Sequence, residues 1–468
     1  MRRNHAIVVS VFYQELKKKI DNYFSKISFS EFSKIFSNFG PFESNPEIAV
    51  GVSGGADSLL LVLLLQQWVL KKNGKLTALI VNHNLRSGSM AEIKILKGWL
   101  RKYKINYKVF HWVGKKPKTR IQEIARSVRL KMLTDWCFQN GIIHLCLAHN
   151  LDDQAETFLI RLSRGSGVYG LSAMAPISVY KHVRLLRPFL FFGKERIILT
   201  LEKMKQDWIE DPSNKNTNFQ RVRIRNIRSI LGEEGIDNNK LSQTSKNLGR
   251  AKAAILDNVS SLAAESVSIY PEGYVILHRG KFLKAPEEIR LKLLSHILMC
   301  VSGKEFSPRL KNLEKLDRVL CSSRKNFGST LHSCQIESLK KSIPDNKIIF
   351  FREMASIQDK KILLNGKSCI WDNRFQVSCD IKIKNTMIYC AKLGADGLKQ
   401  VLKFFPDAGG SSIPYKVKLA LPSVWAGRSL LSVPHLNFRK LAKNVVFNDS
   451  SAAFKPSVSL GMHTTWVV

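Results

Sequence analysis

Short apolar runs alternate with helical patterns between residues 47 and 149, and this alternation constrains the fold more than any other feature of the sequence. The apolar runs are rich in β-branched residues and occupy 47–53, 76–83, 107–112 and 142–149. The helical patterns between them cover 58–70, 90–103 and 120–139. This arrangement predicts βαβ units and a parallel sheet with right-handed crossovers. Ligands of such sheets bind beyond the carboxyl ends of the strands, and we expect the functional site there.

The flanking segments follow other patterns. Residues 11–40 are typical of a basic amphipathic helix that Pro41 and Pro46 end. From about residue 236 helical patterns prevail around a lone strand at 274–279, and past Phe327 short strands surround one helix at 395–405. We predict an N-terminal helical extension, a parallel-sheet α/β domain, a helical domain and a small mixed α+β C-terminal domain, over 1–44, 45–232, 233–325 and 326–468.

The chain is strongly basic. Its 74 lysines and arginines exceed its 37 acids and give a formal net charge of +37. A folded chain tolerates such repulsion best when a polyanion is its partner, so nucleic acid is the first candidate. A solubilising basic surface or a genome biased toward lysine would produce the same composition, and charge alone does not decide between them.

Cysteine spacing and hydropathy exclude several classes. The eight cysteines are scattered, without a C-x-x-C pair or the Cys/His spacing of a zinc site, so we expect reduced thiols and no iron–sulfur cluster. The longest apolar run, Leu59–Leu65, is too short to cross a bilayer and is typical of a helix buried against a sheet. No secretory signal pattern precedes it. We expect a cytoplasmic protein without membrane attachment.

A glycine loop, within AVGVSGGADSLLLV at 49–62, joins the first predicted strand to the first predicted helix. The free amides of Gly54, Gly55 and Ala56 can face an anion with help from the helix dipole, and phosphate is the natural guest. The hydroxyls of Ser53 and Ser58 add donors. An ordinary glycine-rich turn capped by serine is the alternative.

The loop lacks the lysine of the nucleoside triphosphatase P-loop and carries Asp57 instead. An acid beside phosphates makes sense only if Mg²⁺ lies between them, so Asp57 is the candidate metal ligand.

Three later stretches add charged side chains. Gln122, Ala125, Arg126 and Arg129 share one helical face, and the two guanidiniums can reach one anion or form surface ion pairs. The stretch at 148–167 runs from a strand into a helix whose first turns display Asp153, Glu156 and Thr157 on one side. Residues 211–214, D-P-S-N, form a turn before arginines at 221, 223 and 225.

The acids and the histidine also have ordinary interpretations. Asp152 and Asp153 are favourable in the first turn of any helix, where each stabilises by a few tenths of a kcal/mol to about 1 kcal/mol. Glu156 could pair with an arginine, and His149 could be a satisfied buried histidine. Only the joint occurrence of these stretches favours a functional site.

S-G-G-A-D-S (53–58), V-N-H-N-L-R (81–86), H-N-L-D-D-Q-A-E-T (149–157), D-P-S-N and R-x-R-x-R, in this order, resemble the tRNA(Ile)-lysidine synthetases, a PP-loop family of N-type ATP pyrophosphatases. The resemblance is dense over 48–228 and weaker later. It implies an adenine-nucleotide hydrolase-like fold and attachment of L-lysine to C2 of the wobble cytidine, position 34, of the isoleucine tRNA with a CAU anticodon. By this resemblance, ATP would adenylate the cytosine O2 with loss of pyrophosphate, and the lysine amine would displace AMP. The tRNA that carries lysidine would read AUA instead of AUG and accept isoleucine instead of methionine.

The resemblance also implies roles for individual residues. Asp57 would hold Mg²⁺ and be catalytic, while Asp153 and Glu156 would bind the lysine ammonium and help it lose a proton. The implied ATP-binding residues are Ser53, Gly54, Gly55, Ala56, Asp57, Ser58, His83, Arg126 and Arg129. The implied tRNA-binding residues are Arg164, beside a loop over the pocket at 164–167, and Arg221, Arg223 and Arg225.

Two departures and several alternatives remain. Asn82 and Asn84 stand where the family usually has an acid and a glycine, and Leu130 replaces a common tyrosine, whereas the phosphate loop is complete. A tRNA-thiolating relative is the nearest alternative, but such enzymes generally need cysteine pairs. GMP or NAD synthetases act on small molecules and leave the charge unexplained. A tRNA-binding or chaperone-like module with a vestigial nucleotide site would bind tRNA without turnover.

Overall fold

The computed structural model describes most of the chain as two compact units, with the boundary between Ala253 and Ala254. The described residues are 25–83, 88–114, 121–180, 182–210, 220–322, 327–339, 347–358, 360–363, 368–383, 386–410, 412–440 and 445–460. No helix in these ranges is both long and apolar enough to cross a membrane.

The first unit is built on a mainly parallel sheet. Its strands are β1 (Glu47–Gly51), β2 (Lys75–Asn82), β3 (Asn106–His111), β4 (His144–Cys146), β5 (Ile177–Tyr180) and β6 (Val183–Leu186). They lie in the order β3-β2-β1-β4-β6-β5, and β5 alone runs antiparallel to its neighbour. The register pairs Ile48 of β1 with Leu76 of β2 and with His144 of β4. The predicted parallel α/β domain is confirmed.

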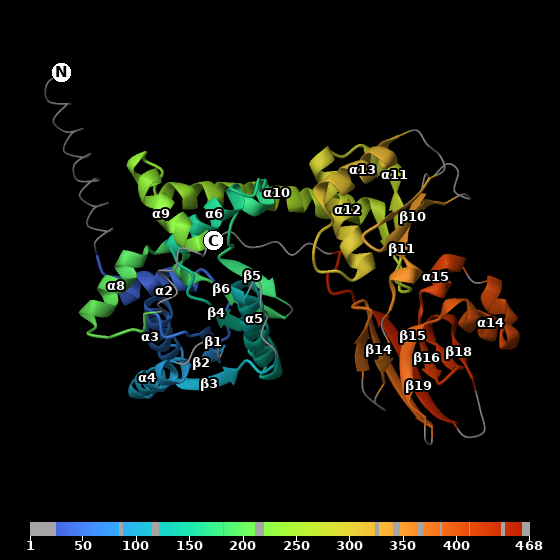
Figure 1. The fold of residues 1–468 in the computed structure, drawn as a ribbon, viewed down its shortest axis with the longest axis horizontal. Helices are drawn as coiled ribbons and strands as arrows, with labels where there is room; N and C mark the ends of the chain where they lie inside the picture. The colour runs from blue at the N-terminus through green and yellow to red at the C-terminus, as the bar shows by residue number, and fades with distance from the viewer. Residues whose placement is uncertain are drawn as a thin grey trace. The chain divides into compact units, whose positions relative to one another are not determined.

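Helices cover both faces of this sheet (Figure 1). They are α2 (Phe29–Ser37), α3 (Ala56–Leu70), α4 (Ser89–Lys102), α5 (Ile121–Gln139), α6 (Leu151–Leu162), α7 (Val168–Leu171), the 3-10 helix η1 (Pro188–Phe191), α8 (Lys194–Lys203) and α9 (Gln220–Glu233). Side chains of α2, α3, α4 and α8 share one core with the sheet. Helix α5 packs on the opposite face. Alternation along β1 supplies both cores, because Ile48 and Val50 point to the first and Ala49 to the second.

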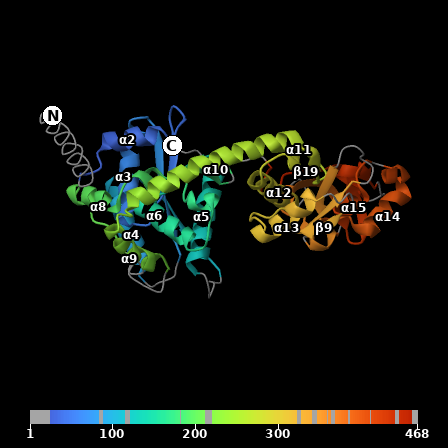
Figure 2. The same ribbon diagram turned by 90° about the horizontal axis from the view of Figure 1, so that it is seen from above.

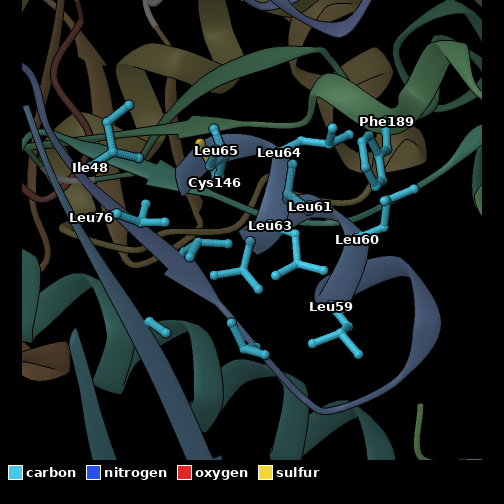
Figure 3. Packing of buried hydrophobic residues seen from close by; sticks show 14 of the residues in the cluster. Ile48, Leu59, Leu60, Leu61, Leu63, Leu64, Leu65, Leu76, Cys146 and Phe189 are labelled. Carbon is cyan, nitrogen blue, oxygen red and sulfur yellow. The ribbon is translucent and has the colours of Figure 1, made fainter. Parts of the chain in front are cut away.

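Helix α3 explains the longest apolar run of the sequence. Each residue of Leu59–Leu65 is at most 3% exposed, because the sheet, α2 and α8 enclose the helix. Figure 3 shows these leucines beside Ile48, Leu76, Cys146 and Phe189. A helix that is hydrophobic all round must be buried, as predicted. This burial fixes the position of the loop from which α3 begins.

Of the helix expected at 11–40, residues 11–24 lie outside the described residues. The described part forms α2, whose N-cap Ser28 accepts a hydrogen bond from the Glu31 amide. Phe32, Phe36 and Phe39 are fully buried in the core that α3 occupies. Helix α2 therefore packs as part of the first unit.

The boundary between the units falls within α10 (Asn238–Ser266), a continuous helix in Figure 2. The elements that follow are β7 (Val267–Ile269), β8 (Val275–His278), α11 (Arg279–Leu283), α12 (Glu287–Ser302), α13 (Leu310–Cys321), β9 (Gly328–Leu331), β10 (Cys334–Ser338) and β11 (Lys347–Arg352). The strands form a sheet in the order β7-β8-β11-β10-β9. A strand was predicted at 274–279, and β8 lies there. The prediction that this strand stands alone is wrong, because β8 pairs with β7 and β11.

The rest of the second unit is rich in strands. It contains η3 (Met354–Ser356), β12 (Lys361–Ile362), β13 (Ser368–Trp371), β14 (Phe375–Ile383), β15 (Ile388–Lys392), α14 (Gly394–Phe404), η4 (Pro406–Gly410), α15 (Tyr415–Leu419), β16 (Pro422–Ala426), β17 (Ser429–Val433), η5 (Pro434–Leu436), β18 (Phe438–Arg439) and β19 (Val445–Phe454). The sheets run β12-β15-β16-β17-β18 and β13-β14-β19. Helical and then β-rich regions follow the α/β domain as expected, while the predicted domain boundaries stay a prediction.

Candidate active site

The glycine loop lies between the end of β1 and the start of α3. Gly54 has φ +89°, a conformation that glycine adopts without strain. Ile209 covers this glycine: its amide donates to the Gly54 carbonyl over 3.0 Å, and a Cβ at position 54 would lie 2.7 Å from its Cδ1. Gly55 is the N-cap of α3 and gives no side-chain hydrogen bond. The first-turn amides of α3 therefore have no side-chain cap, which suits an anion.

The two loop serines have different roles. The Ser58 hydroxyl donates to the Gly55 carbonyl over 3.0 Å and accepts from the Ser53 amide over 3.1 Å. Its proton is thus used to hold the loop in shape. The Ser53 hydroxyl lies 3.2 Å from that of Ser58 and is the one that can turn toward a ligand.

A cavity of about 440 Å³ opens above the carboxyl ends of β1, β2 and β4. Among the residues that line it are Ser53, Gly55, Asp57, Ser58, Asn82, His83, Arg129 and His149. The cavity brings together six of the predicted ATP-binding residues at the place where the fold predicts a ligand. Asn84 lies outside the described residues, and Asn82 is buried, with its amide donating to the Met90 sulfur over 3.2 Å.

Several basic side chains gather beside this cavity. Arg126 and His149 are joined by a contact of 3.0 Å between Nη2 and Nε2. Burial lowers the pKa of Arg126 and of Arg129, and burial with the neighbouring arginines holds the pKa of His149 well below its ordinary value. The imidazole is therefore neutral at physiological pH, and the excess of positive charge is suited to an anionic ligand. The side chain of Gln122 lies outside the described residues.

Sequence reasoning missed Arg187, which belongs to the same group. Burial, with Arg126 adding repulsion, lowers the pKa of Arg187 to about 10. Its Nη1 donates to the Ala175 carbonyl over 2.8 Å and to the Ser178 hydroxyl over 3.0 Å. The signal was an arginine directly after β6, where the strand end reaches the ligand edge of the sheet.

Helix α6 begins at the same edge with a capping box. The Asn150 side-chain oxygen accepts from the Asp153 amide, and the Asp153 carboxylate accepts from the Asn150 amide over 3.1 Å. The Asn150 side-chain nitrogen donates to Oδ1 of Asp57 over 2.9 Å. One asparagine therefore links the glycine loop to the acidic start of α6.

Asp153 is a capping residue as well as a predicted lysine-binding residue. Burial raises the pKa of its carboxyl above the ordinary value, and Arg221, whose Nη2 lies 3.3 Å from Oδ1, opposes that shift. The side chain keeps 24% of its area exposed. A partly exposed carboxylate with a raised pKa can hold an ammonium group and accept its proton.

Glu156 is fully buried under the arginines of α9. Arg221 Nε lies 2.9 Å from Oε2, Arg225 Nε lies 2.8 Å from Oε1, and Arg228 Nη1 lies 3.4 Å from Oε1. Arg228 also binds Asp152 over 2.6 Å. Sequence reasoning missed Arg228, although 221, 225 and 228 follow helical spacing.

The other predicted tRNA-binding arginines are exposed. Arg223 lies on α9, and Arg164 donates to Gln220 over 3.2 Å. Arg161 donates to the carbonyls of Gly170 and Ala173 over 2.7 and 2.8 Å and holds the segment around α7. The D-P-S-N turn at 211–214 lies outside the described residues.

The second carboxylate oxygen of Asp57 is paired with a lysine from a distant stretch. Nζ of Lys194, the first residue of α8, lies 2.6 Å from Oδ2. Mg²⁺ in nucleotide sites is usually held by one or two carboxylates together with phosphates, so the Asp57 carboxylate is a suitable kind of ligand for the predicted ion. Across the described ranges, no group of three or more His, Cys, Asp or Glu is arranged to hold a metal ion.

Comparisons with known proteins decide the family. A family model described as a PP-loop domain matches residues 24–230. The tRNA(Ile)-lysidine synthase of Wolbachia sp. subsp. Brugia malayi (strain TRS) is 32% identical over 411 residues, which cover 87% of this chain and 92% of that protein. The chain belongs to the tRNA(Ile)-lysidine synthase family. Two other tRNA(Ile)-lysidine synthases agree: that of Orientia tsutsugamushi (30% identical, covering 90% of this chain and 96% of that one) and that of Ruegeria pomeroyi (32%, 84% and 90%).

The family confirms the resemblance found in the sequence and the PP-loop fold. Membership of this ATP-utilising PP-loop family implies that the nucleotide is ATP. In this member of the lysidine synthase family, one edge of the sheet brings together the glycine loop, the arginines of α5 and the acids of α6. The roles of individual residues stay predictions.

Proposed function

We propose that this chain attaches L-lysine to C2 of the wobble cytidine of the isoleucine tRNA with a CAU anticodon, forming lysidine with release of AMP and pyrophosphate. Family membership supports the reaction. The observation that carries the assignment of the site is the Asn150 side chain, which joins Asp57 of the phosphate loop to Asp153 of the acidic helix start. The two half-reactions then share one pocket, most simply in the cytoplasm where tRNA is found.

In the first half-reaction the chain binds the triphosphate and aligns it with the cytosine O2. The uncapped amides at the start of α3 and the Ser53 hydroxyl contact the leaving pyrophosphate. When bound at Asp57, Mg²⁺ would neutralise charge on the leaving phosphates. Arg126 and Arg129 hold the α-phosphate side, and His83 lines the cavity where the adenosine would lie.

In the second half-reaction a lysine amine replaces AMP. The free amine has a pKa of roughly 10.4, so it arrives as ammonium and must lose a proton before it attacks. Asp153 is partly exposed and its pKa is raised, so it can hold the ammonium and accept that proton. Glu156 is engaged by three arginines and can contribute only where Arg221 withdraws, so we assign the first contact to Asp153.

The positive charge serves the tRNA. The anticodon loop is single-stranded, so one cytosine can enter the pocket at little unstacking cost while basic side chains follow the phosphates. Arg164 and Arg223 are exposed, and the side chains of Arg221 and Arg225 keep 33% and 47% of their area exposed, so all four can still reach phosphate.

The test follows labelled lysine into tRNA. Purified protein with Mg²⁺ and ATP should transfer label to CAU-anticodon isoleucine tRNA and release AMP and pyrophosphate only when both lysine and tRNA are present. The same tRNA with uridine at position 34 is the control. Absence of label with the cytidine tRNA would contradict the proposal, and tRNA binding without turnover would favour a binding module.

A further inference from the structure

Lys194 is placed where the phosphate loop meets the acidic helix start. Its ammonium lies 2.6 Å from Oδ2 of Asp57, while the Asn150 amide occupies Oδ1. The two residues are 137 positions apart in the sequence. No motif in the sequence predicted this contact. The Lys194 ammonium provides, beside the glycine loop, the lysine cation that the loop sequence lacks.

The backbone of Lys194 is anchored to α6. Its amide donates to Oδ2 of Asp152 over 2.8 Å, and the Leu151 amide donates to the Phe192 carbonyl over 3.0 Å. Arg228 and Asn238 hold the other oxygen of Asp152 at 2.6 and 3.0 Å. The Cα of Lys194 is therefore fixed relative to the site, whatever its side chain does.

The side chain itself is free to change partner. The Lys194 and Asp57 side chains are 37% and 27% exposed, so the pair lies at the rim of the cavity that Asp57 lines and is not locked in the core. An ion pair of this exposure stabilises by at most about 1 kcal/mol. A triphosphate is a far stronger partner for an ammonium group than one carboxylate, because it carries several negative charges.

We propose that Lys194 supplies the phosphate-binding lysine that the glycine loop does not encode. Without nucleotide it holds Asp57 in position. With nucleotide bound, the Lys194 ammonium turns on its anchored backbone to the β- or γ-phosphate, and Oδ2 of Asp57 would then be available to hold Mg²⁺. This inference rests on the proposed use of ATP and adds a residue to the part of the site that carries the leaving pyrophosphate.

The test compares the binding of ATP and of AMP. Equilibrium titrations with Mg²⁺, without tRNA or lysine, would use wild type, K194M, K194R and the control K203M, which removes an exposed lysine from the far end of α8. K194M should weaken ATP binding by about 10- to 100-fold, the range for a hydrogen bond between charged groups, and leave AMP binding unchanged. K194R should recover part of the loss, and K203M should bind like wild type.

Several outcomes would overturn the inference. One is K194M binding ATP as tightly as wild type, and another is an equal loss for ATP and AMP, which would indicate a general distortion of the site. A wild type that binds no ATP would instead contradict the proposed function, so the two failures are distinguishable.

A double-mutant cycle separates phosphate contact from mere support of Asp57. In a D57N background, K194M should weaken ATP binding further, because the phosphate contact does not pass through position 57. If K194M has no additional effect there, Lys194 acts only by positioning Asp57 and the inference fails.

Discussion

The side-chain amide of Asn150 donates to Oδ1 of Asp57 over 2.9 Å, while the carbonyl oxygen of the same side chain caps α6. A single amide therefore performs two tasks, and its two atoms can be tested separately.

Replacing Asn150 should separate helix stability from activity. Asn150→Ala removes the cap and should cost about 1 kcal/mol of unfolding free energy, together with activity. Asn150→Asp keeps a capping oxygen but places a second carboxylate against Asp57. We expect the cap of α6 to survive and AMP release to fall strongly, measured by hydrogen exchange of the α6 amides and by nucleotide assay. Full activity of Asn150→Asp would show that the contact with Asp57 is dispensable.

Asp57 and Asp153 should fail at different steps. Asp57→Asn should abolish tRNA-dependent pyrophosphate release, because the first half-reaction needs that carboxylate. Asp153→Asn should still release pyrophosphate but raise the KM for lysine by about 10- to 100-fold, since it loses a charge-assisted contact with the ammonium. Steady-state assays with varied lysine separate the two. Similar mild effects of both substitutions would refute this division of roles.

Glu156 should stabilise α9 more than it contributes to chemistry. Glu156→Ala leaves Arg221, Arg225 and Arg228 without their shared carboxylate and should cost about 1.5 to 3 kcal/mol, because Arg221 and Arg225 are partly exposed and water can solvate them. Hydrogen exchange of the α9 amides should accelerate. Arg223→Ala, an exposed change on the same helix, is the matched control and should leave exchange unaltered. Unchanged exchange in Glu156→Ala would contradict a structural role.

Stability should fall in acid partly because of His296 on α12. Burial, aided by Lys292, lowers the pKa of His296 from its ordinary value of 6.5 to about 4. Between these values the unfolded chain binds the proton and the folded chain does not, so stability decreases as pH falls through this window. His296→Gln should remove up to about 1.4 kcal/mol per pH unit of that slope. Urea unfolding at several pH values would measure this slope for wild type, His296→Gln and the exposed control His111→Gln. A slope in His296→Gln equal to that of wild type would contradict the prediction.

Four of the six strands of the first sheet could be predicted, because each is a short apolar run between helical patterns. β4 is shorter than its predicted run, and β5 and β6 were not predicted. The phosphate loop could also be predicted from the sequence, since Gly54, Gly55 and Asp57 lie within one continuous stretch. Contacts between stretches that are distant in the sequence could not be predicted from it. The position of Lys194 against Asp57 depends on how α8 packs on α3, which no local pattern encodes.

The arginines after residue 220 show a different limit. Written as R-x-R-x-R, they suggested a row of side chains toward tRNA. In a helix, however, Arg221 and Arg225 share one face and Arg223 takes another. The fold therefore divides the motif between an internal acid and solvent, and only knowledge that the segment is helical, with a buried Glu156 opposite, predicts that division.

The conformation of the phosphate loop also depends on Ile209, which lies far from the loop in the sequence. Because its side chain fills the space where a Cβ at 54 would stand, a mutation of Gly54 meets both backbone strain and a collision, and a smaller residue at 209 would relieve only the collision. The two positions therefore differ in the substitutions that they tolerate. Position 209 can accept a smaller residue, whereas position 54 nearly requires glycine.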